Sequence, residues 1–332
     1  MKARCILFTG IGGVTLGETN VPDPDEGEVL IETDRTCISP GAELSSLAGR
    51  QPDAPPWPFI PGFMLVGHIV ACGPHTPFKE ETAVICSGTS KADVNRYRGG
   101  HISHAVRNAC DVVALPEGMN LLHSSVAKLA AITHHGLRLG SPQPGENVAV
   151  IGLGVIGQLS ARLHAMAGAR VVAADLSPHR VAQARAMGVE AVVAGSSLSA
   201  AFKEAFPDGA DIVVDATGSP TVLREALEIA EEAPWDDSPN PSRPRLIVQG
   251  SYPGDFALPY PAAFTKELAL HVPRAMQPRD LRTALDLIHT GKLQVADLIS
   301  TVRSPEEAPQ AYAELSEPNT RAMTFAFRWK TR

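Results

Sequence analysis

Residues 147–175 read NVAVIGLGVIGQLSARLHAMAGARVVAAD, and this stretch decides the fold. The apolar run Asn147–Ile151 predicts a buried strand, and the apolar-periodic segment from about Val155 predicts a helix that Gly168 ends. A second apolar run, Arg170–Ala174, predicts the next strand. Strand, helix and strand in this order are typical of a parallel sheet, in which a helix crosses over between neighbouring strands.

The same alternation continues through the second half of the chain. Ser177-Pro178 has the form of a helix start, with a capping serine and a proline in the first turn, and Gly188 ends that helix. Ser219-Pro220 predicts a further helix to about Glu232. More strands are expected at Ala191–Ala194, Asp211–Ala216, Arg245–Gln249 and Leu268–Val272. We therefore expect an α/β fold class in which residues 123–273 form a Rossmann doubly wound parallel sheet.

The two ends of the chain have a different pattern of apolar residues from that of the middle. Residues 1–122 contain short apolar runs broken by proline and glycine, which favour a barrel-like antiparallel domain. The tail predicts a helix from Asp280 to about Thr290, a strand at Ile299–Val302, a helix at Pro305–Leu315 and a strand at Met323–Trp329. We expect this tail, residues 274–332, to fold back and complete the first domain. The polar, proline-rich connection 231–244 is predicted to be a solvated insertion.

Composition bounds the classes of function. A chain of 332 residues is too long for one compact core of ordinary size, so two domains are expected. The net charge of −7 and the aromatic content of 5% argue against binding to nucleic acid or to an anionic membrane. The five cysteines are scattered without a C-x-x-C pair, which favours reduced thiols and a cytoplasmic location. No apolar run is long enough to span a membrane.

The turn after the first predicted strand of the sheet carries a ligand signal. Gly152, Gly154 and Gly157 form the pattern G-x-G-x-x-G, and Val155 and Ile156 open the helix that follows. Glycines at this place let the backbone approach a pyrophosphate, and the helix start offers free N–H groups and the positive end of the helix dipole. The pattern alone is weak, but its strand–turn–helix context indicates a dinucleotide site.

An acid at the end of the next strand sharpens that prediction. Asp175 lies 23 positions after Gly152, where a carboxylate can accept both ribose hydroxyls of NAD and would repel the extra phosphate of NADP. Arg180 lies one helical turn further and is within reach of the adenosine side, so NAD is favoured over NADP without closing the question. Two later turns, Ala216-Thr217 and Gly250-Ser251, are expected either to pass the nicotinamide half or to serve as tight structural turns.

With these features the chain resembles the medium-chain dehydrogenase/reductase superfamily of zinc-type alcohol dehydrogenases, polyol dehydrogenases and quinone reductases. The segments that carry the resemblance are GEVLIETDRTCIS (27–39), GGHISHAVRNACDVVALPEGM (99–119), 144–175 and ADLISTVRSPEEAPQAYAEL (296–315). The resemblance implies a GroES-like β-barrel catalytic domain made from both chain ends, a substrate in the cleft between two domains, and a homodimer formed through the strand near Leu268–Val272.

The positions that bind catalytic zinc in these enzymes have changed here. By resemblance the three ligands fall on Pro40, Phe63 and about Lys128, and the glutamate neighbour of the second ligand falls on Met64. None of these side chains is a thiolate, imidazole or carboxylate, which are the ligands that zinc prefers in proteins. The proton-relaying serine or threonine matches Ala42. We therefore expect a zinc-independent site.

Two short segments resemble a zinc-lacking branch that includes the bacteriochlorophyllide dehydrogenases. They are ISPGAE at 38–43 and PGF at 61–63, and KELAL…QPRDLRTALDLI in the second half is also similar. The substrate does not follow from this resemblance, because one fold carries many activities.

Without zinc, a cationic or hydroxyl side chain must stabilise the negative charge that develops on the substrate's oxygen and supply or accept its proton. Lys128 is the first candidate proton donor, with a helix-surface lysine as the alternative. His134 and Tyr97 are further catalytic candidates, and of the neighbours His134 and His135 at most one is expected to point inward. For the histidine candidates, a position on the surface without a role in catalysis is the alternative. The substrate pocket is expected to contain Pro40, Phe63, Met64 and His101.

These features predict an NAD-dependent, zinc-independent oxidoreductase that interconverts a secondary alcohol and a ketone by hydride transfer. A quinone or enoyl reductase is an alternative, and so is a catalytically silent relative that binds the cofactor. The apolar residues Phe63 and Met64 favour a bulky or hydrophobic small-molecule substrate over a small polyol.

Overall fold

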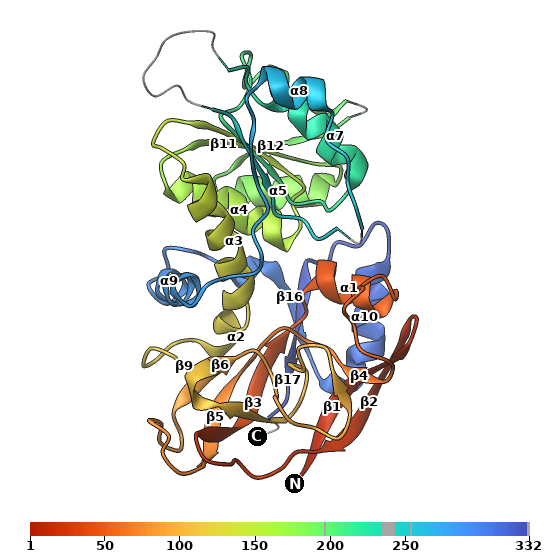
Figure 1. Cartoon of the computed structure of the whole chain (residues 1–332), viewed down its shortest axis with the longest axis vertical. Coiled ribbons are helices and arrows are strands. Elements are labelled where there is room, and N and C mark those ends of the chain that lie inside the picture. Colours follow the sequence, from red (N-terminus) through yellow and green to blue (C-terminus); the bar gives the residue numbers. More distant parts are fainter. Residues whose placement is uncertain (196, 234–242, 253, 331–332) are drawn as a thin grey trace. The chain divides into compact units, whose positions relative to one another are not determined.

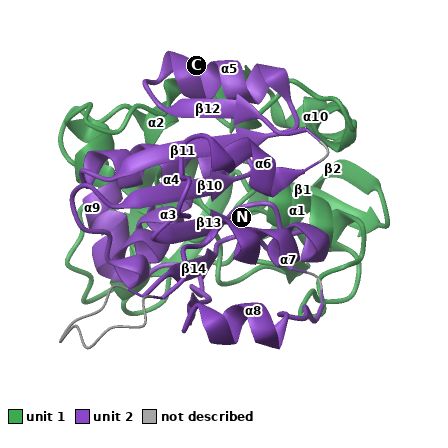
Figure 2. Cartoon of the chain, turned by 90° about the horizontal axis from the view of Figure 1, so that it is seen from above, with its two compact units in different colours: residues 1–128, 285–332 green, residues 129–284 purple. Residues whose placement is uncertain are grey.

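The computed structural model describes residues 1–195, 197–233, 243–252 and 254–330. The chain divides into two compact units, shown in green and purple in Figure 2. The first unit contains Met1–Lys128 and Leu285–Arg332, and the second contains Leu129–Ala284. The domain limits expected from the sequence, at residues 122 and 274, stay a prediction. Most of the expected insertion at 231–244 lies outside the described residues.

The second unit is built on one sheet of six strands (Figure 1). The strands are β10 (Asn147–Ile151), β11 (Arg170–Asp175), β12 (Glu190–Val193), β13 (Ile212–Asp215), β14 (Arg245–Val248) and β15 (Ala269–His271). Their order in the sheet is β12-β11-β10-β13-β14-β15, and each neighbouring pair is parallel. The first of these strands in the sequence, β10, lies in the middle of the sheet, and the later strands are added on both sides of it. This order confirms the predicted doubly wound topology.

Alternate side chains of the central strand β10 pack on opposite faces of this sheet. Val148 and Val150 belong to one buried apolar cluster, and Ala149 and Ile151 belong to another. Both faces of a parallel sheet are covered by helices, so its central strands are apolar throughout. This explains why residues 147–151 are a continuous apolar run rather than an alternating one.

The helices that follow the strands begin close to the predicted positions. Helix α4 (Val155–Met166) follows β10, and Gly168 beyond its end has a φ of +88°. Helix α5 (Pro178–Ala186) follows Ser177, whose hydroxyl accepts a hydrogen bond from the backbone N–H of Arg180. The other helices of residues 127–289 are α3 (Ala127–Gly140), α6 (Leu198–Lys203), α7 (Pro220–Ile229), α8 (Tyr260–Thr265) and α9 (Pro278–His289). The two six-residue helices α6 and α8 were not expected from the sequence.

The first unit contains two sheets. One is a four-stranded sheet in the order β2-β1-β4-β7, and the other is a seven-stranded sheet in the order β16-β17-β3-β5-β6-β9, with β8 paired to β3. The strands are β1 (Lys2–Gly10), β2 (Gly13–Asn20), β3 (Glu28–Cys37), β4 (Phe59–Ile60), β5 (Leu65–Cys72), β6 (Ala83–Cys86), β7 (Asn95–Arg96), β8 (His104–Asn108), β9 (Val113–Ala114), β16 (Ile299–Arg303) and β17 (Thr324–Arg328). Most pairs are antiparallel, while β4–β7 and β16–β17 are parallel.

The tail of the chain, from Leu285 onward, belongs to this unit. Strand β17 pairs antiparallel with β3, so that Ala326 lies opposite Cys37. Among the described residues, the α-helices that lie wholly within the unit are α1 (Pro40–Leu47), α2 (Leu121–Ser124) and α10 (Ala308–Ser316). All five cysteines are free thiols. In the described part of the chain, no helix has the length and apolar character needed to cross a membrane.

Candidate active site

The glycine-rich turn between β10 and α4 is shaped by steric requirements. Gly152 has a φ of +86°, in the left-handed region that side chains rarely adopt. A Cβ atom on Gly157 would lie 1.7 Å from the carbonyl oxygen of Gly152. At Gly154, in contrast, an added Cβ would meet no described atom within 4 Å. Gly152 and Gly157 are therefore needed by the fold itself, while Gly154 leaves space beside the N-terminal turn of α4.

The carboxylate of Asp175 holds this turn against the end of β11. Its Oδ2 accepts a hydrogen bond from the backbone N–H of Leu153 at 2.6 Å, and its Oδ1 accepts one from the N–H of Ser177 at 2.7 Å. Nη1 of Arg180 lies 3.8 Å from Oδ2. Asp175 therefore has a positioning role, and Arg180 offsets part of its charge. Contact of either residue with a nucleotide stays a prediction.

The two later turns lie against each other at the ends of β13 and β14. The backbone N–H of Gly250 donates to the carbonyl oxygen of Asp215 at 2.9 Å. The N–H and the hydroxyl of Thr217 donate to Oδ1 of Asp215 at 3.0 and 2.6 Å, and the hydroxyl of Tyr252 donates to Oδ2. A Cβ atom on Gly152 would lie 2.8 Å from Cγ2 of Thr217, so this turn also adjoins the glycine-rich one. These contacts give Ala216-Thr217 and Gly250-Ser251 a structural role, and their contact with the nicotinamide half stays a prediction.

Asp215 and Tyr252 were missed from the sequence. Asp215 is fully buried, and burial together with this carboxylate raises the pKa of the Tyr252 hydroxyl well above its ordinary value. An acid at the end of an apolar strand, directly before Ala216-Thr217, was the signal available for Asp215. Tyr252 had none, because its partner lies 37 positions away.

Lys128 is buried in the first unit, with 8% of its surface exposed. Its Nζ donates hydrogen bonds to the carbonyl oxygen of Phe63 at 2.7 Å and to the hydroxyl of Ser87 at 3.1 Å. Burial, and then the positive charge of Arg98, lower the pKa of Lys128 to about 8. The alternative of a solvated lysine on the helix surface is therefore wrong. The ammonium group instead connects two of the positions that match zinc ligands in the resemblance.

The other residues expected in the substrate pocket have different surroundings. Met64 is 3% exposed and belongs to the interior of the unit, while Phe63 is half-buried. Pro40 is half-buried at the first position of α1. Phe63 is therefore the better placed of the two apolar residues to meet a ligand.

Tyr97 lies next to Phe63, and the two rings meet edge to face with centroids 6.4 Å apart. The hydroxyl of Tyr97 donates to Oδ1 of Asp53 at 2.8 Å. Burial, followed by this hydrogen bond, raises the pKa of Tyr97 to about 12. Tyr97 thus keeps its proton near neutral pH and uses it in the hydrogen bond to Asp53, which makes Tyr97 a weaker candidate for proton donation than Lys128.

His134 and His135 both contact Asp280, a fully buried carboxylate at the start of α9. The Nδ1 atoms lie 2.9 Å from Oδ1 and 3.3 Å from Oδ2, and Nε of Arg138 donates to Oδ1 at 2.8 Å. The expectation that at most one of the two rings points inward is corrected, because both turn to one acid. Burial alone would raise the pKa of Asp280, but hydrogen bonds from Arg138, the N–H of Gln277 and His134 lower it below its usual range.

His101 lies in the interior rather than at the surface of a loop. Its Nδ1 is 2.8 Å from Oγ1 of Thr36, and its Nε2 is 2.9 Å from Oε2 of Glu43. Glu43 is itself buried and accepts hydrogen bonds from the hydroxyl of Tyr312 and the N–H of Ser39. Because both ring nitrogens are used within the core, the surroundings of His101 do not support the expected contact with substrate, nor do they fit a surface histidine.

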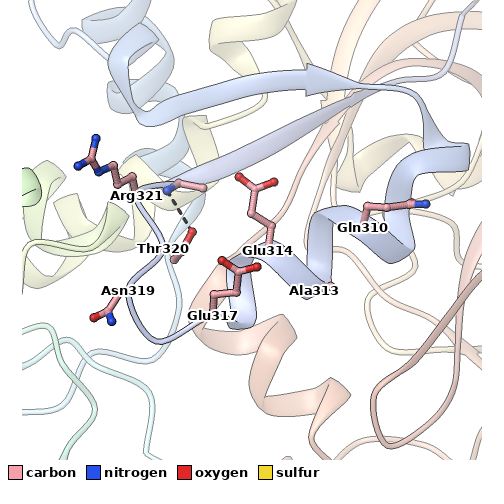
Figure 3. A pocket seen from close by; sticks show the side chains of 8 residues that line it. Gln310, Ala313, Glu314, Glu317, Asn319, Thr320 and Arg321 are labelled. Atoms are coloured by element: carbon pink, nitrogen blue, oxygen red, sulfur yellow. Dashed lines mark hydrogen bonds between the residues drawn. The ribbon is translucent and has the colours of Figure 1, made fainter.

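An open hollow of about 610 Å³ lies on the first unit beside the end of α10 (Figure 3). Its lining residues are Gln310, Ala313, Glu314, Glu317, Asn319, Thr320, Arg321 and Ala322. Glu314 is paired with Arg303, and the hydroxyl of Thr320 accepts from the N–H of Ala322 at 3.2 Å. None of the predicted site residues lines this hollow.

Most of the predicted residues thus form three groups. Lys128, Phe63 and Tyr97 come together in the first unit. The glycine-rich turn, Asp175, Arg180 and the two later turns come together in the second. His134 belongs to the Asp280 cluster.

Comparison with known proteins finds similar chains among dehydrogenases. The family model described as "Zinc-binding dehydrogenase" matches residues 155–233. A curated relative, the 2-desacetyl-2-hydroxyethyl bacteriochlorophyllide A dehydrogenase of Cereibacter sphaeroides, is 24% identical over 99% of both chains.

Two solved structures share the fold over nearly the whole chain. The RspB alcohol dehydrogenase of Escherichia coli CFT073, in complex with NADH, has a TM-score of 0.84 at 18% identity and covers 98% of this chain and 99% of its own. A zinc-binding dehydrogenase of Sinorhizobium meliloti 1021, bound to NADP, has a TM-score of 0.82 at 18% identity and covers 99% of both chains. The chain therefore shares the fold of alcohol dehydrogenase-like enzymes, and its sequence is similar to that of oxidoreductases of the medium-chain dehydrogenase/reductase superfamily.

Proposed function

We propose that the chain is an NAD-dependent, zinc-independent dehydrogenase that interconverts a secondary alcohol and a ketone. The observation that carries this proposal is the buried ammonium group of Lys128. Both of its hydrogen-bond acceptors, the carbonyl of Phe63 and the hydroxyl of Ser87, are uncharged. An ammonium group has three protons, and the third is proposed to reach the oxygen of the substrate.

The side chains at the matched ligand positions do not fit zinc. Pro40 and Phe63 offer no donor atom, and a protonated lysine repels a cation. In addition, Nζ of Lys128 occupies the space next to the carbonyl of Phe63. Among the described residues, no group of three or more His, Cys, Asp and Glu side chains could hold a metal ion. We therefore derive no step through zinc.

Lys128 has the properties that general acid–base catalysis needs. With a pKa of about 8, the amine is mostly protonated at neutral pH. This pKa is also close enough to neutral pH for the amine to give up a proton and take it back during the reaction. In ketone reduction Lys128 would donate its proton to the developing alkoxide, and in alcohol oxidation the neutral amine would take it back. Phe63 and Met64 leave the neighbourhood apolar, which strengthens a hydrogen bond from the ammonium group.

The residues of the second unit fit a dinucleotide. NAD would supply the hydride acceptor or donor. The open space at Gly154 and the first N–H groups of α4, at Val155 and Ile156, suit a pyrophosphate. Asp175 would accept the ribose hydroxyls and disfavour the phosphate of NADP. Because Arg180 lies 3.8 Å from Asp175 and offsets part of its charge, we expect a preference for NAD rather than an exclusion of NADP.

The test is a coupled measurement of turnover and metal content. The purified full chain is assayed with NADH and NADPH against a panel of bulky ketones, and its zinc content is measured by elemental analysis. We expect turnover with less than stoichiometric zinc and a lower dissociation constant for NADH than for NADPH. Absence of turnover with every ketone would leave a silent cofactor-binding relative, and preference for quinones or enones would favour the reductase alternative.

A pair of lysine variants tests the proposed acid. Lys128→Met removes the proton donor with little change in volume and should lower kcat about 10²- to 10⁴-fold. Lys79→Met removes an exposed lysine of the same unit and should leave kcat unchanged. Equal activity of the two variants would reject Lys128 as the acid. A homodimer stays a prediction of the resemblance, and a cytoplasmic location stays a prediction from the scattered cysteines.

A further inference from the structure

Lys128 is one of two cations beside the ring of Phe63. Its Nζ lies 5.4 Å from the centroid of the ring, and Cζ of Arg98 lies 5.8 Å from the same centroid. Cζ of Arg98 also lies 5.5 Å from the ring of Tyr97. All three distances fall within the range at which an aromatic face attracts a cation. The two aromatic rings therefore hold Arg98 at a defined place close to the proposed acid.

The charges around Phe63 are not balanced among the described residues. Asp53 is the acid nearest to Arg98, with its Oδ2 at 4.0 Å from Nη2, and its Oδ1 already accepts a hydrogen bond from the hydroxyl of Tyr97. Arg107, whose charge also lowers the pKa of Lys128, has its own partner in Asp111 at 3.0 Å. Lys128 donates to two uncharged oxygens. Arg98 thus has one carboxylate at 4.0 Å, which it shares with the hydroxyl of Tyr97, and no ion pair of Lys128 is found among the described residues, which leaves a net positive charge at the site.

The two cations differ in access to solvent. The side chain of Arg98 is 51% exposed, whereas Lys128 is 8% exposed. Arg98 also has a φ of +73°, in the left-handed region, so the backbone as well as the two rings fixes its direction. A guanidinium that stacks on aromatic rings keeps its N–H edge available for the bidentate pairing that suits a carboxylate. The buried Lys128 can therefore meet the reacting group of a substrate, and the more exposed Arg98 can meet a charged group of the same substrate that lies nearer to solvent.

We propose that Arg98 is a specificity-determining residue that binds a carboxylate of the substrate. The substrate class is then a ketone or secondary alcohol that has an apolar body and an anionic group. The apolar body packs on Phe63, the reacting oxygen meets Lys128, and the carboxylate pairs with Arg98. This inference rests on the proposed function, because it uses Lys128 as the group that meets the reacting oxygen.

The test compares two probes that differ in charge. The aryl ketone 4-acetylbenzoate has an apolar ring and a carboxylate, and methyl 4-acetylbenzoate is its neutral ester. Their dissociation constants for the full chain are measured by isothermal titration calorimetry, with and without NAD⁺, which leaves the ketones unreduced. We expect the acid to bind about tenfold or more tightly than the ester, as charge-assisted hydrogen bonds imply.

Three variants assign that difference to a residue. Arg98→Gln should remove the preference for the acid and leave binding of the ester unchanged, while Arg98→Lys should retain part of the preference. Arg96→Gln is the matched control, because it removes an exposed positive charge two residues away whose Nη1 donates to the carbonyl of Ala92. It should keep the full preference. No binding of the acid, equal binding of acid and ester, or an equal loss in Arg96→Gln would overturn the inference.

The outcome for Arg98 is separable from that of the proposed function. Reduction of both ketones by NADH with equal kcat/KM would leave the dehydrogenase activity standing and reject the role of Arg98. Tighter binding of the acid through Arg98, without oxidation of NADH by either ketone, would leave the anion site standing and reject the activity.

Discussion

The glycine-rich turn of the second unit and the Lys128 site of the first both place a charge beside buried strands, but the charges are opposite. At the turn, the carboxylate of Asp175 accepts hydrogen bonds from the backbone N–H groups of Leu153 and Ser177. At the other site, the ammonium of Lys128 donates to Phe63 and Ser87. The partners of Lys128 lie 65 and 41 positions away, whereas Ser177 lies 2 positions from Asp175.

This difference teaches what each site depends on. The turn is fixed by steric contacts between backbone atoms that one short segment brings together. The Lys128 site exists only when the segment at Phe63 between β4 and β5, the loop at Ser87 and the start of α3 have assembled, and its chemistry depends on the low polarity that this assembly creates. A small change of shape should break the first site, and a change of charge should break the second.

The largest effect is expected at the turn. Gly157→Ala puts a Cβ atom 1.7 Å from the carbonyl oxygen of Gly152, a contact with backbone that cannot relax cheaply. We expect a loss of about 3 kcal/mol or more in the free energy of unfolding, measured by urea denaturation.

Gly154→Ala is the matched control for that substitution. Its Cβ meets no described atom within 4 Å, so stability should change by less than about 1 kcal/mol. Binding of NADH should nevertheless weaken, since the methyl group occupies the space proposed for the pyrophosphate. Equal stability losses in the two variants would remove the steric account of the turn.

The second effect concerns a buried charge within the second unit. Asp280→Asn removes the acid that holds His134, His135 and Arg138, and should cost about 2–3 kcal/mol at pH 7. The pKa of Asp280 is lower in the folded state than in the unfolded chain, where it is about 4. The stabilisation is therefore complete above that unfolded pKa and is lost as the pH falls below it.

Denaturation of wild type and Asp280→Asn at several pH values checks this sign. The difference between them should be constant from about pH 5 to 7 and should shrink below about pH 4. The exposed residue Asp286 lies on the same helix, and Asp286→Asn should show no such dependence. A difference that persists unchanged at low pH would contradict the depressed pKa of Asp280.

A third and smaller effect is the pH dependence of activity. The pKa of Lys128 is about 8, and ketone reduction requires the protonated form. The kcat/KM for reduction by NADH should be level below pH 7 and fall about tenfold per pH unit above pH 8 or so, with oxidation showing the opposite trend. Lys128→Arg should lose this fall, because arginine stays protonated throughout. An unchanged profile in that variant would assign the ionisation to another group.

The alternation of strands and helices in the second unit was predictable because it depends on periods of a few residues. The six parallel strands had local signals, and so did the ends of α4 and α5, which stop shortly before Gly168 and Gly188. The helices α6 and α8 had none, since six residues are too few to establish a helical period.

The candidate sites were predictable to the extent that they are local. The sequence pointed to the glycine-rich turn with Asp175 correctly as one cluster. His101 was misjudged because its partners Thr36 and Glu43 lie 65 and 58 positions away, and no local pattern reveals a buried acid. Asp280 had a signal that was overlooked: it stands three residues after Gln277 and accepts the N–H of that residue, as an acid in the first turn of a helix does.

The smallest expected effect is a difference in stability between two helix starts that have the same Ser-Pro sequence. Ser177-Pro178 and Ser219-Pro220 both read as capped helix starts, yet only the hydroxyl of Ser177 accepts from the backbone N–H at the third helical position. The hydroxyl of Ser219 instead lies 2.9 Å from that of Thr221. Ser177→Ala should therefore cost about 0.5–1 kcal/mol, the low end for caps because the bond is 3.5 Å long, and Ser219→Ala should cost less. Equal losses in urea denaturation would mean that the sequence signature, rather than the hydrogen bond, carries the stabilisation. Both losses would then arise in the unfolded chain, which the two substitutions alter alike.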